Sequence, residues 1–182
     1  MKIYWTAAIL ALSIARGAGV PSIDVWIDDD VSSAKMLELH KTLVSSLFAE
    51  IGVQIQWHDL EDGQREAGAP GFEIRVVRQA LPAASAAALA STLIATSAIT
   101  VFEDRVRQRA GQSHPGAAKV LPGYVIAHEL AHAIQGISRH SDNGILKADW
   151  SNDDCTAMLF EKLKFSDFDA LLIRQRAAYG TR

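Results

Sequence analysis

The sequence predicts an α+β fold, and three observations lead to it. Short segments in which apolar and polar residues alternate, as in half-buried strands, recur along the first hundred residues. A long stripe of apolar residues at helical spacing separates the first two of these segments. After residue 120 the chain has mainly helical patterns. We therefore expect a sheet of about four strands packed on a long helix and on a second central helix, followed by a helical C-terminal part.

The strands are expected at residues 23–27, 53–58, 72–78 and 98–102, each a short apolar or alternating segment. The connection at residues 59–71 is rich in charge, Gly and Pro, which is typical of an exposed loop.

Residues 79–102 carry no charge, so a membrane span must be considered. Most of these residues are Ala, Ser and Thr, and Pro82 interrupts the run, so its hydrophobicity is modest. We expect a loop or short helix at residues 83–89 before the last strand.

The first helix is expected to begin after Ser32 or Ser33 and to end at Gly52. Its apolar stripe consists of Met36, Leu39, Leu43, Val44, Leu47, Phe48 and Ile51. Further helices are expected to begin within residues 104–108, to occupy residues 153–163, and to follow Ser166. The apolar face of the last helix would include Phe168, Leu171, Leu172 and Ile173.

The N-terminus has the layout of a secretory signal peptide. Lys2 precedes an apolar run from residue 3 to residue 15, and Ser13 and Ala15 occupy the −3 and −1 positions of a cleavage site. We expect a signal peptide at residues 1–15, possibly to 18, a single domain at residues 19–182, and a secreted or periplasmic protein. A buried first strand or helix is the alternative.

Composition narrows the possible partners. The chain has 182 residues and a formal net charge of −3, so no basic footprint indicates nucleic acid. We expect no stable membrane span once the signal peptide is removed, and the sequence does not indicate an oligomeric state. Cys155 is the only cysteine, so no internal disulfide can form, and we expect it to be a small buried apolar residue.

The strongest chemical signal lies in residues 125–136, which read as a helix with Pro122 suited to its first turn. His128 and His132 are four residues apart, so their rings project from one face. Two neutral imidazoles at this spacing can reach one Zn²⁺ at about 2.0–2.1 Å. Glu129 stands beside the first histidine, where it can take a proton from a water that attacks a carbonyl.

A catalytic zinc needs a third protein ligand and one open position. Gly136 ends the helix and allows the chain to turn back, and the next histidine is His140. Residues 142–150 then read as a tight turn that carries an apolar side chain. Three of the six histidines therefore lie in one short segment in the order that a catalytic zinc site requires.

Three other residues are rival candidates for the third ligand. Glu161 lies on a later predicted helix, at a sequence separation from His132 that suits another class of zinc peptidases. The residues that flank Glu161 do not match that class, so a surface carboxylate is the favoured interpretation. His114 precedes the zinc helix and lacks the turn that follows His140. His40 lies beside an apolar stripe and is expected to be a packed or boundary histidine rather than a ligand.

The segment His-Glu-Leu-Ala-His-Ala-Ile-Gln-Gly-Ile-Ser-Arg-His-Ser resembles the zinc site of the metzincin metallopeptidases, H-E-x-x-H-x-x-G-x-x-H followed by a Met-turn. It is more similar to a group of poorly characterised secreted bacterial proteins with the wider spacing His-Glu-x-x-His-x-x-x-Gly-x-x-x-His-Ser, followed by Gly-Ile-Met and a Trp. The resemblance implies that His128, His132 and His140 bind zinc and that Glu129 is the general base. It also implies a twisted, mostly parallel sheet.

Two departures from the metzincin pattern matter. The loop before His140 has two extra residues and must bulge to bring this ring back to the metal. By the resemblance, residues 144–146 form the Met-turn, and Leu146 replaces the methionine. Leucine can still supply an apolar floor, since a Leu-for-Met exchange costs less than about 1.5 kcal/mol. Residues 98–103 would be the edge strand that pairs with an extended substrate.

These observations predict a secreted zinc endopeptidase whose partner is a peptide or protein substrate. Two alternatives stay open. The chain could be a non-catalytic zinc-binding or partner-binding domain on a metallopeptidase frame, or the histidines could simply be hydrogen-bonded within a structural helix. Glu129 favours the enzyme, because a structural zinc site is closed by four protein ligands and needs no base.

Overall fold

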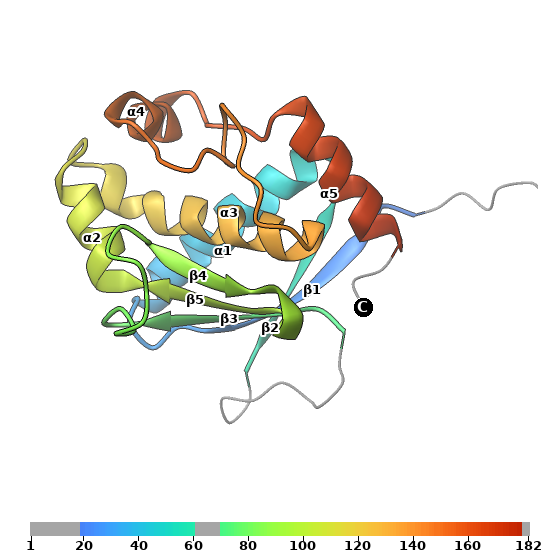
Figure 1. Ribbon diagram of the computed structural model, residues 1–182, viewed down its shortest axis with the longest axis horizontal. Helices are drawn as coiled ribbons and strands as arrows, with labels where there is room; N and C mark the ends of the chain where they lie inside the picture. The colour runs from blue at the N-terminus through green and yellow to red at the C-terminus, as the bar shows by residue number, and fades with distance from the viewer. Residues whose placement is uncertain (1–18, 61–69, 180–182) are drawn as a thin grey trace, which may run out of the picture.

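A computed structural model describes residues 19–60 and 70–179, which form an α+β fold with one five-stranded sheet. The helices gather over one side of the sheet (Figure 1). The strands are β1 (Ser22–Asp28), β2 (Gln54–Asp59), β3 (Phe72–Val77), β4 (Ala90–Leu93) and β5 (Ala98–Phe102). The five α-helices are α1 (Ala34–Glu50), α2 (Glu103–Gly111), α3 (Leu121–Gln135), α4 (Asn152–Phe160) and α5 (Asp167–Tyr179). The expected signal peptide lies outside the described residues.

The sheet is mostly parallel, as expected, with strand order β2-β1-β3-β5-β4. β1 pairs in parallel with β2 and β3, and β3 pairs in parallel with β5. Only β4 is antiparallel to its neighbour β5. Side chains that point toward the helices, such as Val25, Ile74 and Ile99, are almost completely buried. Alternation along each strand therefore fixes which face of the sheet carries the core.

The four strands expected from the sequence are present, but the expected edge strand is wrong. Residues 98–102 pair with β3 on one side and with β4 on the other, so they lie inside the sheet. Glu103, also assigned to that strand, begins α2. The edge is β4, which follows turns at residues 82–88 and returns through a 3₁₀ turn (Ile94–Thr96) to pair with β5. Four residues of Ala, Ser, Thr and Leu carry too weak a pattern to predict such a strand.

Helix α1 begins after the N-cap Ser33, and Gly52 follows its end with a positive φ of 73°. It lies against α3 at Gly123, where an added Cβ would come within 2.9 Å of Leu43. The two helices therefore pack closely against each other, and both lie above the sheet (Figure 1).

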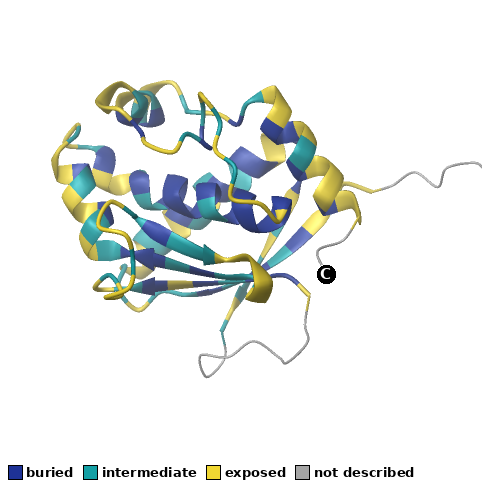
Figure 2. Cartoon of the chain, in the orientation of Figure 1, coloured by how far each residue is buried: buried dark blue, intermediate teal, exposed yellow. Residues whose placement is uncertain are grey.

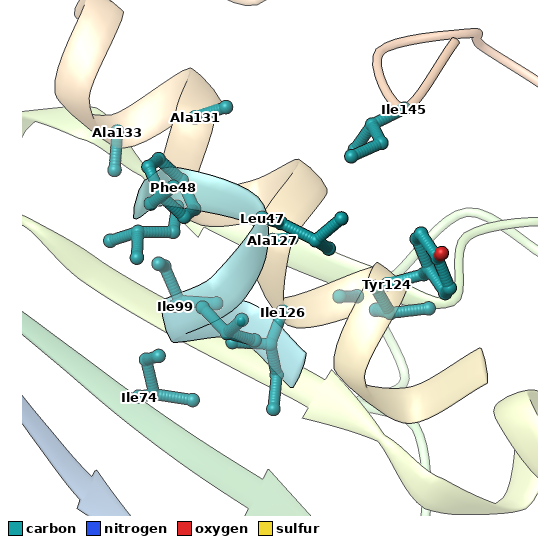
Figure 3. Close-up of a cluster of buried hydrophobic side chains, with 14 of the residues drawn as sticks. Leu47, Phe48, Ile74, Ile99, Tyr124, Ile126, Ala127, Ala131, Ala133 and Ile145 are labelled. Carbon is teal, nitrogen blue, oxygen red and sulfur yellow. The ribbon is translucent and has the colours of Figure 1, made fainter. Parts of the chain in front are cut away.

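Helix α3 is buried on nearly all sides, as its dark colour in Figure 2 shows. Tyr124, Ile126 and Ala127 belong to the central hydrophobic cluster together with Phe48 of α1 and Ile74 of β3 (Figure 3). Because apolar burial contributes roughly 25 cal/mol per Å², this helix is held mainly by its packing. The residues on α3 therefore have fixed positions.

The C-terminal part is helical, as expected. Ser151 and Asp154 form a capping box at the start of α4, and Ser166 caps α5. The apolar face expected on α5 is partly wrong, because Phe168 and Leu171 are exposed and only Ile173 of the expected set is fully buried. Its helical repeat instead turns Asp169 and Ala170 inward.

Two further findings concern the cysteine and the hydrophobicity of the helices. Cys155 is buried, as the sequence suggested. Among the described helices, none has the length and apolar character needed to cross a membrane.

A substitution at Gly144 tests how tightly the turn after His140 packs against the segment that precedes α5. Gly144 has a φ of 76°, and an added Cβ would come within 2.4 Å of the Lys164 carbonyl oxygen. We expect Gly144→Ala to lower the free energy of unfolding by about 1–3 kcal/mol, because left-handed strain and a backbone clash combine. Gly136→Ala is the control, since its φ is 69° but its Cβ would meet nothing within 4 Å. Urea unfolding measures both, and equal losses would contradict the close packing at Gly144.

Candidate metal centre

His128 and His132 lie one turn apart on α3, and backbone carbonyls fix the protonation of both rings. Nδ1 of His128 lies 2.8 Å from the carbonyl oxygen of Ile145, and Nδ1 of His132 lies 3.1 Å from that of Ile137. A carbonyl oxygen only accepts hydrogen bonds, so each Nδ1 carries the proton and donates it. Each Nε2 is left with an unprotonated lone pair.

These two lone pairs face each other. The Nε2 atoms of His128 and His132 are 3.0 Å apart, and the rings cross at 76°. Two acceptors do not form a hydrogen bond, although their separation is within hydrogen-bond range. Two nitrogens of a tetrahedral zinc site, each about 2.05 Å from the ion, would be roughly 3.3 Å apart. The donor set therefore fits a shared cation better than a hydrogen bond between the rings.

His140 completes the histidine trio, defined here as His128, His132 and His140. Its ring centroid lies 5.3 Å from that of His128 and 4.9 Å from that of His132. Candidate ligand nitrogens of all three lie within 4.8 Å of one another. The loop after Gly136 thus brings His140 back to α3 despite its two extra residues. His140 is exposed, whereas the other two are buried.

Burial keeps the two helical histidines neutral. It lowers the pKa of His128 to about 4, with a smaller lowering from His140. It also lowers the pKa of His132 to about 4, and His128 adds to this effect. Only a neutral imidazole offers a lone pair to a metal, so both rings stay competent as ligands in mildly acidic solution.

The turn expected after His140 contacts His128. Ile145 and Leu146 are both fully buried, and Ile145 supplies the carbonyl that orients His128. The Trp150 ring packs edge-on against His128, with centroids 5.4 Å apart. Leu146 belongs to the hydrophobic core, and its role as the apolar floor of the site stays a prediction.

Asp169 of α5 holds the loop that carries His140, and no sequence pattern indicated this role. Its carboxylate is fully buried, accepts from the Ser141 and Ser166 hydroxyls at 2.7 and 2.6 Å, and pairs with the Arg139 guanidinium. Arg139 also donates to the His140 carbonyl oxygen at 3.2 Å. The residues on both sides of His140 are thus tied to one buried carboxylate.

Glu129 faces a residue that the sequence also did not indicate. The Thr92 hydroxyl of β4 donates to Glu129 Oε2 at 2.6 Å. Thr92 lies between the loop or short helix expected at residues 83–89 and the strand expected at residues 98–102, so nothing marked it as part of a site. Glu129 is partly exposed, and its carboxylate faces the cavity that the trio also lines.

This cavity has a volume of about 410 Å³ and is open to solvent along one side. Residues 87–92 form one wall and residues 147–150 the other, with α3 between them. Its walls are mostly small or apolar, while the trio and Glu129 supply convergent polar groups, as in small-molecule and peptide sites.

The rival ligands do not reach the trio. Glu161 is exposed at the end of α4, and among the described residues it joins no group of metal-binding side chains. The His114 ring packs edge-on against Phe160, and its Nδ1 accepts from a backbone amide. His40 is buried, as expected, and burial lowers its pKa.

No family model matches the chain, and a search of the curated proteins gives no match either. The function must therefore be inferred from the geometry of the site and from the motif.

Asp169 provides a test of how His140 is held. We expect Asp169→Asn to weaken zinc binding by about tenfold or more, because it removes the charge that anchors Arg139 and Ser141. Asp167→Asn is the matched control, since Asp167 is exposed on the same helical turn. Competition with a chromogenic chelator measures affinity, and circular dichroism checks folding.

Ser141→Ala removes one of the hydrogen bonds to Asp169 and leaves the buried charge pair in place. We expect a smaller loss of zinc affinity in this variant. Unchanged affinity in both Asp169→Asn and Ser141→Ala would contradict the anchoring role.

The lowered histidine pKa values predict how stability depends on pH. Between pH 6.5 and about 4, unfolded His128 and His132 bind protons that the folded chain does not bind. Stability of the metal-free protein must therefore fall as pH falls through this window. We expect His132→Asn to show a smaller fall in its urea midpoint between pH 7 and 4.5 than wild type does. Parallel pH dependences would contradict the assignment.

Proposed function

We propose that the chain is a zinc-dependent endopeptidase with a metzincin-like fold. The observation that carries the proposal is the convergence of two neutral Nε2 lone pairs and a third imidazole beside Glu129. The parallel sheet with one antiparallel edge strand and the buried helix with its turn beneath support the same proposal.

His128, His132 and His140 would hold the zinc ion, and the exposed His140 ring would move inward to meet the two buried ones. Zinc supplies Lewis acidity, which makes water acidic near neutral pH and polarises the scissile carbonyl. Within the described residues the group contains three histidines and no fourth protein ligand, which fits a catalytic site that keeps one position open.

Glu129 would act as general base and then as general acid. It would accept a proton from the attacking water and pass it to the nitrogen of the leaving amine as the peptide bond breaks. Oε2 is engaged by Thr92, and no described residue donates to Oε1. Oε1 is therefore the oxygen available to the water.

The substrate would be a peptide or protein that binds in extended form. β4 is the edge strand beside the cavity, and main-chain hydrogen bonds to a free edge bind peptides with little regard for sequence. This role, expected from the resemblance for residues 98–103, passes to residues 90–93. The signal peptide expected at residues 1–15 would place the reaction outside the cytoplasm.

The alternative is a non-catalytic zinc-binding or partner-binding domain, which the exposure of His140 favours. A binding domain has no need of a carboxylate beside its ligands, so the state of Glu129 separates the two functions.

The test compares wild type, Glu129→Gln and His140→Ala for zinc content and hydrolysis of a denatured protein. We expect Glu129→Gln to keep zinc and lose at least about a hundredfold in turnover, since it removes the proton acceptor. His140→Ala should weaken zinc binding, because it removes a ligand. His114→Ala, which changes a histidine outside the trio, should change neither property.

Equal hydrolysis by wild type and Glu129→Gln would contradict the assigned mechanism. Full zinc occupancy in His140→Ala would contradict the third ligand. Zinc binding without any hydrolysis by wild type would favour the binding domain.

A further inference from the structure

The hydrogen bond between Thr92 and Glu129 joins the free edge of the sheet to the general base. The ladder between β4 and β5 shows which backbone groups of β4 face outward. Phe102 N donates to the Leu89 carbonyl oxygen at 2.9 Å, so these two residues form a hydrogen-bonded pair. In an antiparallel ladder such pairs alternate with pairs that exchange no hydrogen bonds.

Counting along the register places Thr92 opposite Ile99 at a pair that exchanges no hydrogen bonds. The N–H and C=O of Thr92 therefore point away from β5. β4 ends the strand order of the described sheet, so these groups face the open edge beside the cavity. A peptide that adds to this edge would hydrogen-bond to both groups of Thr92.

The Thr92 side chain points to the helical side. Its hydroxyl donates to Glu129 Oε2 at 2.6 Å, a short distance typical of a hydroxyl on a carboxylate. Thr92 is partly buried, and Ala90 on the same face of the strand is buried. One residue thus contributes its backbone to the peptide edge and its side chain to the base.

We propose that Thr92 is a positioning residue that fixes the Glu129 carboxylate relative to a peptide bound on β4. This inference rests on the proposed peptidase function. The hydroxyl holds Oε2 and so orients Oε1 toward the attacking water and the scissile bond. The backbone of Thr92 would also align the peptide. Thr92 would therefore fix the position of Glu129 and the position of the substrate relative to each other.

Positioning has a different kinetic signature from binding. Main-chain hydrogen bonds to the substrate do not need the hydroxyl, so its loss should leave KM nearly unchanged. Misplacing a catalytic group by about an ångström can cost up to a hundredfold in rate. The loss should therefore appear in kcat.

The experiment compares Thr92→Val, which is nearly isosteric and lacks the hydroxyl, with Thr92→Ser, which keeps it. We expect kcat to fall about tenfold to a hundredfold in Thr92→Val, with zinc content unchanged and KM within about twofold. Thr92→Ser should keep most of the activity. Thr100→Val is the matched control, since Thr100 lies in β5 between the buried Ile99 and Val101 and belongs to the opposite face.

A crystal structure of zinc-loaded wild type and Thr92→Val supplies a readout that does not need turnover. We expect Glu129 Oε2 to stay on the Thr92 hydroxyl in wild type and the carboxylate to rotate in the valine variant. If wild type hydrolyses nothing yet the carboxylate rotates, the peptidase proposal fails and the hold of Thr92 on Glu129 stands. An unmoved carboxylate, an unchanged kcat, or a loss confined to KM would overturn the inference.

Discussion

The protons on the Nδ1 atoms of His128 and His132 decide what the rest of the site can do. Each Nδ1 donates to a backbone carbonyl, one from the turn after the trio and one from the loop that leaves α3. Both Nε2 lone pairs are then turned toward one point, and burial keeps the rings uncharged. An arrangement of two opposed acceptors in a buried place is unfavourable without a cation between them. The fold thus holds two nitrogen lone pairs where a shared cation would stabilise both.

Two different parts of the structure position the three histidines. Helix α3 is fixed by packing against α1 and against the sheet, so the positions of its two histidines do not depend on a metal. His140 lies on an exposed loop and depends instead on the buried Asp169 carboxylate of α5. With His128 and His132 fixed and His140 on a tethered loop, an ion could enter from the cavity and then be enclosed by the movement of His140. Glu129 is held in turn by the edge strand.

The sequence predicted those parts of the molecule that have strong local patterns. The interior strands at residues 23–27 and 72–78 and the stripe of α1 were found because period-2 and period-3.6 burial is visible in the residues themselves. His128, His132 and Glu129 were predicted because the spacing of the two histidines on one helix is a local property. His140 was reached by order along the chain, and the structure brings it to the same place.

The remaining parts depend on contacts between residues far apart in the chain. β4 has too few β-branched residues to be recognised, and it exists because its short segment pairs with β5. Because β4 is present, the sheet edge lies at residues 90–93, and Thr92 of this strand contacts Glu129. Asp169 was hidden because an Asp near a helix start reads as an exposed first-turn carboxylate, whereas Arg139, Ser141 and Ser166 surround it. Phe168 and Leu171 on the same helix were expected in the core because they are apolar and lie at helical spacing. Both are exposed.

X-ray absorption at the zinc edge, on purified protein loaded with one equivalent of Zn²⁺, tests the central claim most directly. We expect scattering from three imidazole nitrogens at about 2.0–2.1 Å together with one oxygen ligand from solvent. A first shell with only two imidazoles, with a carboxylate in place of the third, or with four protein ligands would contradict it.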